Sequence, residues 1–214
     1  MAETTMDANQ AAALAKMQRD FDNARMRQIG GFHFAMVMGA LTMWGAAVTW
    51  AQVTGWAVAE LVAVANALIA AFVLQSTLHE WGHFAGARLA GAESPVLEEP
   101  RKHFFMFDFA MDKNDLRQFL WMSWGGILAP WAVALLVAAA LPLSILSVQV
   151  LLATLVMKAV GVAIFEVPIA RAAAQSGEPG AELAKQVAAG GLTRGRNIGT
   201  VVGLALFALL LMVV

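Results

Sequence analysis

Long apolar runs separated by polar segments dominate the pattern of hydrophobic and polar positions along this chain. A helix needs about 20 residues to cross the roughly 30 Å hydrocarbon core of a bilayer. Five runs reach or approach that length, and they predict membrane-spanning helices at 32–53, 56–83, 119–141, 145–170 and 198–214. We therefore expect an all-α polytopic membrane protein with about five transmembrane helices, surrounded by the lipid bilayer.

Composition supports this fold class and excludes others. The 214 residues are 60% hydrophobic and only 14% charged, which is far from the usual composition of a soluble domain. The formal net charge of −1 and the lack of a basic tract give no indication of nucleic acid binding. The absence of cysteine excludes disulfides, thiolate metal ligands and cysteine nucleophiles.

Residues 1–30 differ from the rest because they are polar and of mixed charge. An imperfect apolar stripe with basic residues beside it predicts an amphipathic helix or a partly disordered cytoplasmic segment. We therefore divide the chain into this N-terminal segment and a transmembrane domain at 31–214.

Lys and Arg concentrate before the first predicted span, between the second and third, and between the fourth and fifth, whereas the turns at 54–55 and 142–144 carry none. The positive-inside rule then predicts a cytoplasmic N-terminus and a C-terminus on the outer side. We expect an integral protein of a bacterial inner membrane.

The main polar loop, between Arg88 and Arg117, contains an aromatic stretch from His103 to Phe109. Aromatic residues favour strands, and Pro100 and a polar cluster at 112–115 bound this stretch. It predicts a short membrane-associated β-hairpin between the second and third spanning helices.

The second predicted span ends in the sequence His79-Glu80-Trp81-Gly82-His83, an H-E-x-x-H motif. On a helix, positions i and i+4 share one face, so His79 and His83 can bind one cation. Glu80 can then act as general base toward a water held by that cation, and zinc suits such a site. In the alternative interpretation, the two histidines are bonded only to water or backbone.

A catalytic zinc site normally has three protein ligands and one open position. Glu166 is the only carboxylate in the fourth predicted span, and its expected depth is similar to that of the two histidines. We expect Glu166 to be the third metal ligand, with Asp108 as the next candidate. A salt bridge from Glu166 to Arg171 is the alternative.

These features together resemble the site-2 protease family of intramembrane zinc metalloproteases, over about residues 56–174. The H-E-x-x-H helix is followed by Ala85-Gly86-Ala87, a strand-like loop, a helix with the sequence Gly125-Gly126-Ile127-Leu128-Ala129-Pro130, and a helix with Pro168 near its inner end. The resemblance implies that His79 and His83 bind zinc and that Glu80 is the general base or acid. It also implies that the segment at 104–109 pairs with an unwound substrate helix by strand addition.

The chain departs from the family in its last core helix, where the family usually carries Asn-x-x-Pro followed by Asp-Gly. Aligned on Pro168, those positions hold Phe165, Ala173 and Ala174. Either Glu166 has taken over the ligand role of that Asp, or the site is degenerate.

The resemblance favours a zinc metalloendopeptidase, a hydrolase that cleaves a membrane helix of a protein substrate. The alternative is a catalytically inactive relative, a pseudoenzyme that serves as a structural or assembly subunit among the partner subunits of a larger membrane complex. A small transporter or channel is a third possibility, indicated only by Lys158 and Glu60 within the predicted spans.

Overall fold

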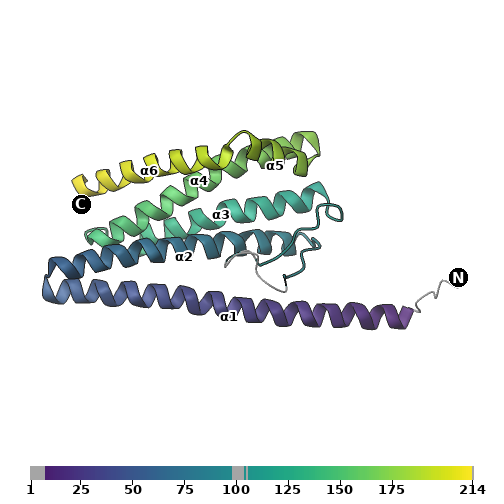
Figure 1. Ribbon diagram of the computed structural model, residues 1–214, viewed down its shortest axis with the longest axis horizontal. Helices are drawn as coiled ribbons and strands as arrows, with labels where there is room; N and C mark the ends of the chain where they lie inside the picture. The colour runs from purple at the N-terminus through teal and green to yellow at the C-terminus, as the bar shows by residue number, and fades with distance from the viewer. Residues whose placement is uncertain (1–7, 98–103, 105, 214) are drawn as a thin grey trace.

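Helices make up nearly all of the regular structure in the computed structural model, which describes residues 8–97, 104 and 106–213 (Figure 1). They are α1 (Ala8–Thr54), α2 (Ala57–Leu89), α3 (Leu116–Ala140), α4 (Leu146–Ser176), α5 (Pro179–Ala188) and α6 (Gly191–Val213). All except the short α5 are long and apolar enough to cross a membrane. The predicted helical fold is therefore confirmed for the described residues, with five helices that are candidates to span a membrane.

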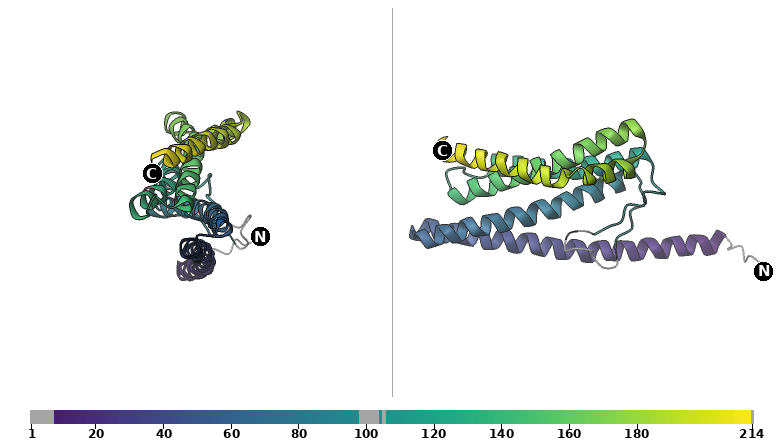
Figure 2. Two further views of the ribbon diagram at one scale, coloured as in Figure 1. Left: turned by 90° about the vertical axis from the view of Figure 1, so that its left-hand side faces the viewer. Right: turned by 45° about the horizontal axis from the view of Figure 1, so that its top comes forward.

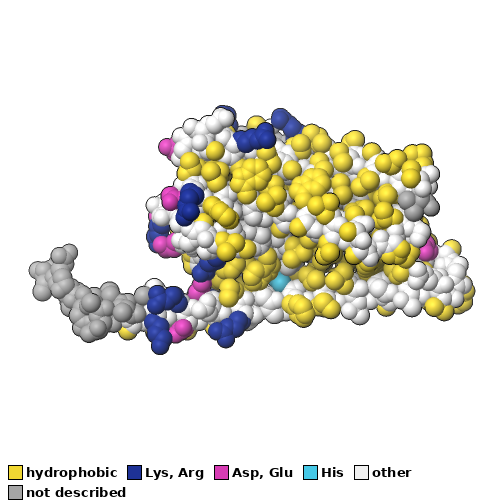
Figure 3. Space-filling view, turned by 180° about the vertical axis from the view of Figure 1, so that it is seen from behind, with side chains coloured by type: hydrophobic (Ala, Val, Ile, Leu, Met, Phe, Trp, Pro, Cys, Tyr) yellow, Lys and Arg dark blue, Asp and Glu magenta, His cyan; other side chains and the backbone are white. Residues whose placement is uncertain are grey.

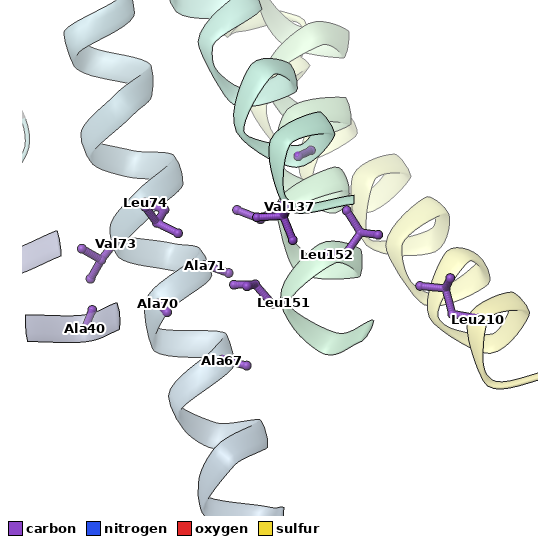
Figure 4. Close-up of a cluster of buried hydrophobic side chains, with 12 residues drawn as sticks. Ala40, Ala67, Ala70, Ala71, Val73, Leu74, Val137, Leu151, Leu152 and Leu210 are labelled. Atoms are coloured by element: carbon purple, nitrogen blue, oxygen red, sulfur yellow. The ribbon is translucent and has the colours of Figure 1, made fainter. Parts of the chain in front are cut away.

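The centre of the bundle is α2, which packs on α1, α3 and α4, while α6 packs on α4 (Figure 2). On α2, Ala67, Ala70 and Ala71 are fully buried in the main core cluster, which also holds Leu151 and Leu152 of α4 (Figure 4). Small side chains on α2 let its neighbours approach closely, and close van der Waals contact is the main source of helix association in lipid.

A row of buried glycines joins α6 to α4. Gly195, Gly199 and Gly203 recur every four residues along one face of α6. A Cβ atom on Gly199 would lie 2.3 Å from the carbonyl oxygen of Met157, and one on Gly195 would lie 2.5 Å from that of Gly161. The two backbones are therefore in direct contact, and no larger residue fits at these positions without separating the helices.

The first helix is much longer than a membrane is thick. Its 47 residues correspond to about 70 Å, roughly twice the length needed for a hydrocarbon core of about 30 Å. The helix has no break near residue 30, where composition suggested a boundary, and its N-terminal part projects past the rest of the bundle (Figure 1). The described part of the N-terminal segment, from Ala8 onward, is thus a continuation of the first span.

Charged side chains gather at the end of the bundle from which α1 projects (Figure 3). This end holds the loop between α2 and α3, where Arg88 pairs with Asp22 of α1 at 2.5 Å and Lys113 pairs with Glu93 at 2.5 Å. The N- and C-termini lie at opposite ends of the bundle (Figure 1). The broad apolar surface between the two ends is the part suited to lipid.

The predicted β-hairpin is not found in the described part of the loop. That part contains one isolated antiparallel bridge, between Val96 and Phe107, and no strand. Residues 98–103 and 105, where the rest of the hairpin was expected, lie outside the described residues. In the described part, residues 106–110 lie antiparallel to residues 93–97, which directly follow α2, and three backbone hydrogen bonds join them.

The described residues do not support the hairpin, because the pairing between 93–97 and 106–110 is sparse and is interrupted at Pro95. Pro95 has no N–H, so its pair with Asp108 has a single hydrogen bond, from the Asp108 N–H to the Pro95 carbonyl at 3.0 Å. The Val96 N–H lies on the outer edge of this pairing and donates to Oδ1 of Asp22 at 2.7 Å, which holds the edge against α1. The segment is therefore an extended loop held by α1.

The start of α3 and the presence of α5 also differ from the predicted spans, for local reasons. Asp115 and Gln118 form a capping box, so α3 begins three residues earlier than hydrophobicity indicated. The helix α5 lies in the polar segment between the fourth and fifth spans, where no helix was expected, and begins with Pro179 in its first turn.

The close contact between α4 and α6 predicts that Gly199→Ala destabilises the protein. Its Cβ would overlap a backbone carbonyl that cannot move independently of α4, so we expect the free energy of unfolding to fall by about 1–3 kcal/mol. Unfolding of the detergent-solubilised protein, followed by circular dichroism, measures this. Gly45→Ala is the matched control because nothing lies within 4 Å of its new Cβ. An equal effect of both substitutions would contradict the proposed packing.

Candidate metal centre

The side chains of His79, His83 and Glu166 converge between α2 and α4. The Nε2 atoms of the two histidines are 3.2 Å apart, and Oε1 of Glu166 lies 3.3 Å from Nε2 of His79 and 3.4 Å from Nε2 of His83. All three side chains are largely buried. Two adjacent turns of one helix and one turn of another thus direct three ligand atoms at a single point.

The spacing of these three atoms suits a tetrahedral metal ion. Ligands at about 2.0–2.1 Å from such an ion are separated from one another by about 3.3 Å. The three observed separations, 3.2, 3.3 and 3.4 Å, all match this ligand–ligand distance. One ion could therefore be bound by all three atoms with little movement, and its fourth position would stay open.

Two backbone carbonyls of α3 orient the imidazoles. Nδ1 of His79 lies 3.0 Å from the carbonyl oxygen of Gly126, and Nδ1 of His83 lies 3.0 Å from that of Met122. A carbonyl can only accept, so each Nδ1 carries the proton and each Nε2 presents its lone pair. Two lone pairs and a carboxylate oxygen then face one another, an arrangement that a cation stabilises.

This arrangement depends on a close approach of α2 to α3. A Cβ on Gly82 would lie 2.4 Å from the carbonyl oxygen of Gly125, and one on Gly86 would lie 2.2 Å from that of Trp121. A Cβ on Gly126 would lie 2.1 Å from the ring of His83. The glycines therefore bring the carbonyls of α3 within reach of the imidazoles and leave space for one of the rings.

A cavity of about 320 Å³ opens beside the three converging side chains. Besides them, its polar lining residues are Glu80, Asp108 and Ser123, and the remaining walls are apolar. The apolar walls come from the loop, α3, α4 and α5: Phe107, Phe109, Met111, Phe119, Met122, Phe165, Ile169 and Leu183. The cavity thus offers an apolar site with a carboxylate, Glu80, next to the first histidine of the motif.

The structure brings together the three residues that the sequence suggested as metal ligands. Glu166 faces both histidines, so the pairing with Arg171 considered from the sequence is not needed to explain its burial. Its other oxygen, Oε2, is buried and has no hydrogen-bond partner among the described residues. Asp108 lines the cavity but is not one of the three clustered residues.

Sequence analysis missed the groups that support the motif. Trp81, inside the motif, donates its Nε1–H to Nδ1 of His33 on α1 at 3.0 Å. His33 is only 2% exposed, so this hydrogen bond is buried between α1 and α2. The carbonyls of Met122 and Gly126 left no signal in the sequence, although the Gly-Gly-x-x-x-Pro run did indicate close helix contact.

Comparison of the chain with family models, with curated proteins and with solved structures finds no match. The interpretation of the site therefore rests on its own geometry and on the motifs.

The contact between Gly126 and His83 predicts that Gly126→Ala weakens metal binding. The added methyl group would displace the ring of His83 from the cluster, so we expect affinity for Co²⁺, measured by its visible absorption, to fall at least about tenfold. Gly45→Ala, in the open on α1, should bind Co²⁺ like the unmodified protein. Unchanged binding by the Gly126 variant would mean that His83 does not contribute from this position.

Proposed function

We propose that this protein is a site-2-protease-like intramembrane zinc metalloprotease that cleaves a membrane helix of a protein substrate. The observation that carries the proposal is the triangle of His79 Nε2, His83 Nε2 and Glu166 Oε1, with sides of 3.2–3.4 Å, beside a cavity that Glu80 also lines. Metal ligands, a general base and space for a substrate occur together in one place.

Zinc fits the donor set best. Two neutral imidazoles and one carboxylate are a known ligand combination of catalytic zinc, and the tetrahedral spacing favours it over the octahedral Mg²⁺. When bound, zinc would supply a Lewis acid that polarises the scissile carbonyl and lowers the pKa of water.

The residues of the chain supply the other parts of the reaction. Glu80 accepts a proton from the attacking water and returns it to the leaving amine, so that the peptide bond is hydrolysed without net change in the enzyme. The apolar walls of the cavity limit access of other water molecules.

The loop segment at 107–109 offers a place for the substrate. It is extended, and its three residues line the cavity next to the motif. A substrate helix must unwind locally before its peptide bond can be attacked, and an unwound strand could pair with this extended backbone. The protein would act in a bacterial inner membrane, with its N-terminus in the cytoplasm and its C-terminus outside.

The departure from the family is compatible with this proposal. Ala173, at the position of the family's usual ligand Asp, is fully buried in an apolar cluster with Phe119 and Ile169. Glu166 precedes it by seven residues, which is two helical turns, so both positions lie on the same face of α4. We infer that the ligand role has moved two turns along that face. An inactive relative that serves as an assembly subunit is the alternative if the site does not bind metal.

Metal analysis of the purified protein tests the proposed ligand set. We expect about one zinc per chain, lost in His79→Ala and in Glu166→Ala because two ligands do not retain the ion well. Asp108→Asn is the matched control and should keep its zinc. Loss of zinc in the Asp108 variant alone would transfer the third-ligand role to Asp108, and no zinc in any sample would leave the assembly-subunit alternative.

Cleavage of a membrane-helix substrate in proteoliposomes tests the role of Glu80. Glu80→Gln keeps the shape but cannot accept the proton, so we expect full zinc content and a loss of rate of at least about 10²-fold. Ser123→Ala, which alters another polar residue of the cavity, should retain zinc and much of the rate. A Glu80→Gln variant with near-normal rate would rule out Glu80 as the base.

A further inference from the structure

Pro130 lies inside α3, four residues after Gly126. In an α-helix the N–H of each residue donates to the carbonyl four residues earlier, and proline has no N–H. The carbonyl of Gly126 therefore lacks its usual helical donor. This is the carbonyl that faces Nδ1 of His79 at 3.0 Å.

We propose that Pro130 is a positioning residue of the metal centre: by withholding an N–H from the Gly126 carbonyl, it reserves that carbonyl for His79. The inference deepens the proposed function and rests on it, because it concerns the orientation of one of the proposed zinc ligands. Pro130 itself does not line the cavity and touches no reacting group.

The second imidazole shows the contrast. His83 bonds to the carbonyl of Met122, which lies one turn earlier on α3. The helical donor to that carbonyl is the N–H of Gly126, which is present, so Met122 serves two donors. Of the two histidines, only His79 bonds to a carbonyl that has no backbone N–H of α3 as a second donor. The two hydrogen bonds have the same length of 3.0 Å, so the difference between them lies in the competing helical donor and not in the distance.

A neighbouring contact holds Pro130 and the motif in register. Gln75 precedes His79 by one turn, and its Nε2 donates to the carbonyl of Leu155 on α4 at 2.7 Å. The same nitrogen lies 3.5 Å from the carbonyl of Pro130, at the limit of a hydrogen bond. This buried side chain therefore contacts both α3 and α4 one turn before His79. A displacement of α3 at residue 130 would shift the position of Gln75 and, through α2, that of His79.

The alternative role of Pro130 is purely structural, as a proline that shapes a membrane helix. The two roles differ in what they require of residue 130. The clash of the ring with the preceding turn contributes only to a structural role, whereas the positioning role depends only on the missing N–H. Replacing Pro130 by alanine restores the N–H, and replacing it by lactic acid, the hydroxy analogue of alanine, does not.

The test compares zinc affinity, by competition with a chelator, in the full-length protein carrying Pro130→Ala or lactic acid at position 130. Outer-sphere partners of metal-bound histidines contribute about 10–100-fold to affinity. For Pro130→Ala we expect an effect at the low end of this range, with zinc bound about tenfold more weakly. The protein with lactic acid at position 130 should bind zinc with near-normal affinity. The Co²⁺ absorption spectrum should change in the alanine variant alone.

Pro168→Ala is the matched control, since Pro168 also lies inside a spanning helix, α4, near the same site. It should bind zinc like the unmodified protein. Equal affinity of Pro130→Ala and the unmodified protein would overturn the inference, as would equal loss in the alanine and lactic acid variants. If the unmodified protein binds no zinc, the proposed function fails first, and the two failures remain distinguishable.

Discussion

The direct backbone contact between α2 and α3 is the constraint on which the metal centre depends. Gly82 and Gly86 meet Gly125 and Trp121 with no side chain between them, and Gly126 leaves the space that the ring of His83 fills. At a usual interhelical distance of 8–10 Å the imidazoles would not reach the carbonyls of α3. Both Nδ1 atoms face backbone carbonyls of α3 at 3.0 Å, so the packing of α2 on α3 determines the position of the two Nδ1–H groups.

The rest of the bundle follows the same principle at other contacts. The core of α2 is built from alanines, and α6 lies on α4 through a glycine row. Because lipid tails are as apolar as the side chains, burial of large apolar residues would give these helices little reason to associate. Close approach of backbones supplies that reason, and it also fixes the depth at which Glu166 of α4 meets the histidines of α2.

Sequence alone predicted the helical fold, the five spans, and the residues that converge. The apolar runs are long enough to be unambiguous, and Glu166 stood out as a lone carboxylate in its span. The hairpin was expected because aromatic content indicates strands, whereas the observed pairing is short and interrupted at Pro95, and its outer edge is bonded to Asp22, about 75 residues earlier in the chain. The partners of His79 and His83 could not be predicted, because backbone carbonyls are the same in every residue and only the packing of α3 selects two of them. The roles of zinc and Glu80 stay predictions.

The uninterrupted course of α1 has a mechanical consequence. The helix is about 70 Å long, and its projecting N-terminal half continues the axis of the half that packs in the bundle. It therefore behaves as a stiff rod. If the half packed in the bundle tilts by about 10°, the N-terminal end of the helix, about 35 Å from its middle, moves sideways by about 6 Å. Because Trp81 of the motif is bonded to His33 on this rod, an angular displacement of the exposed end and a local shift at the motif are two parts of one rigid-body movement.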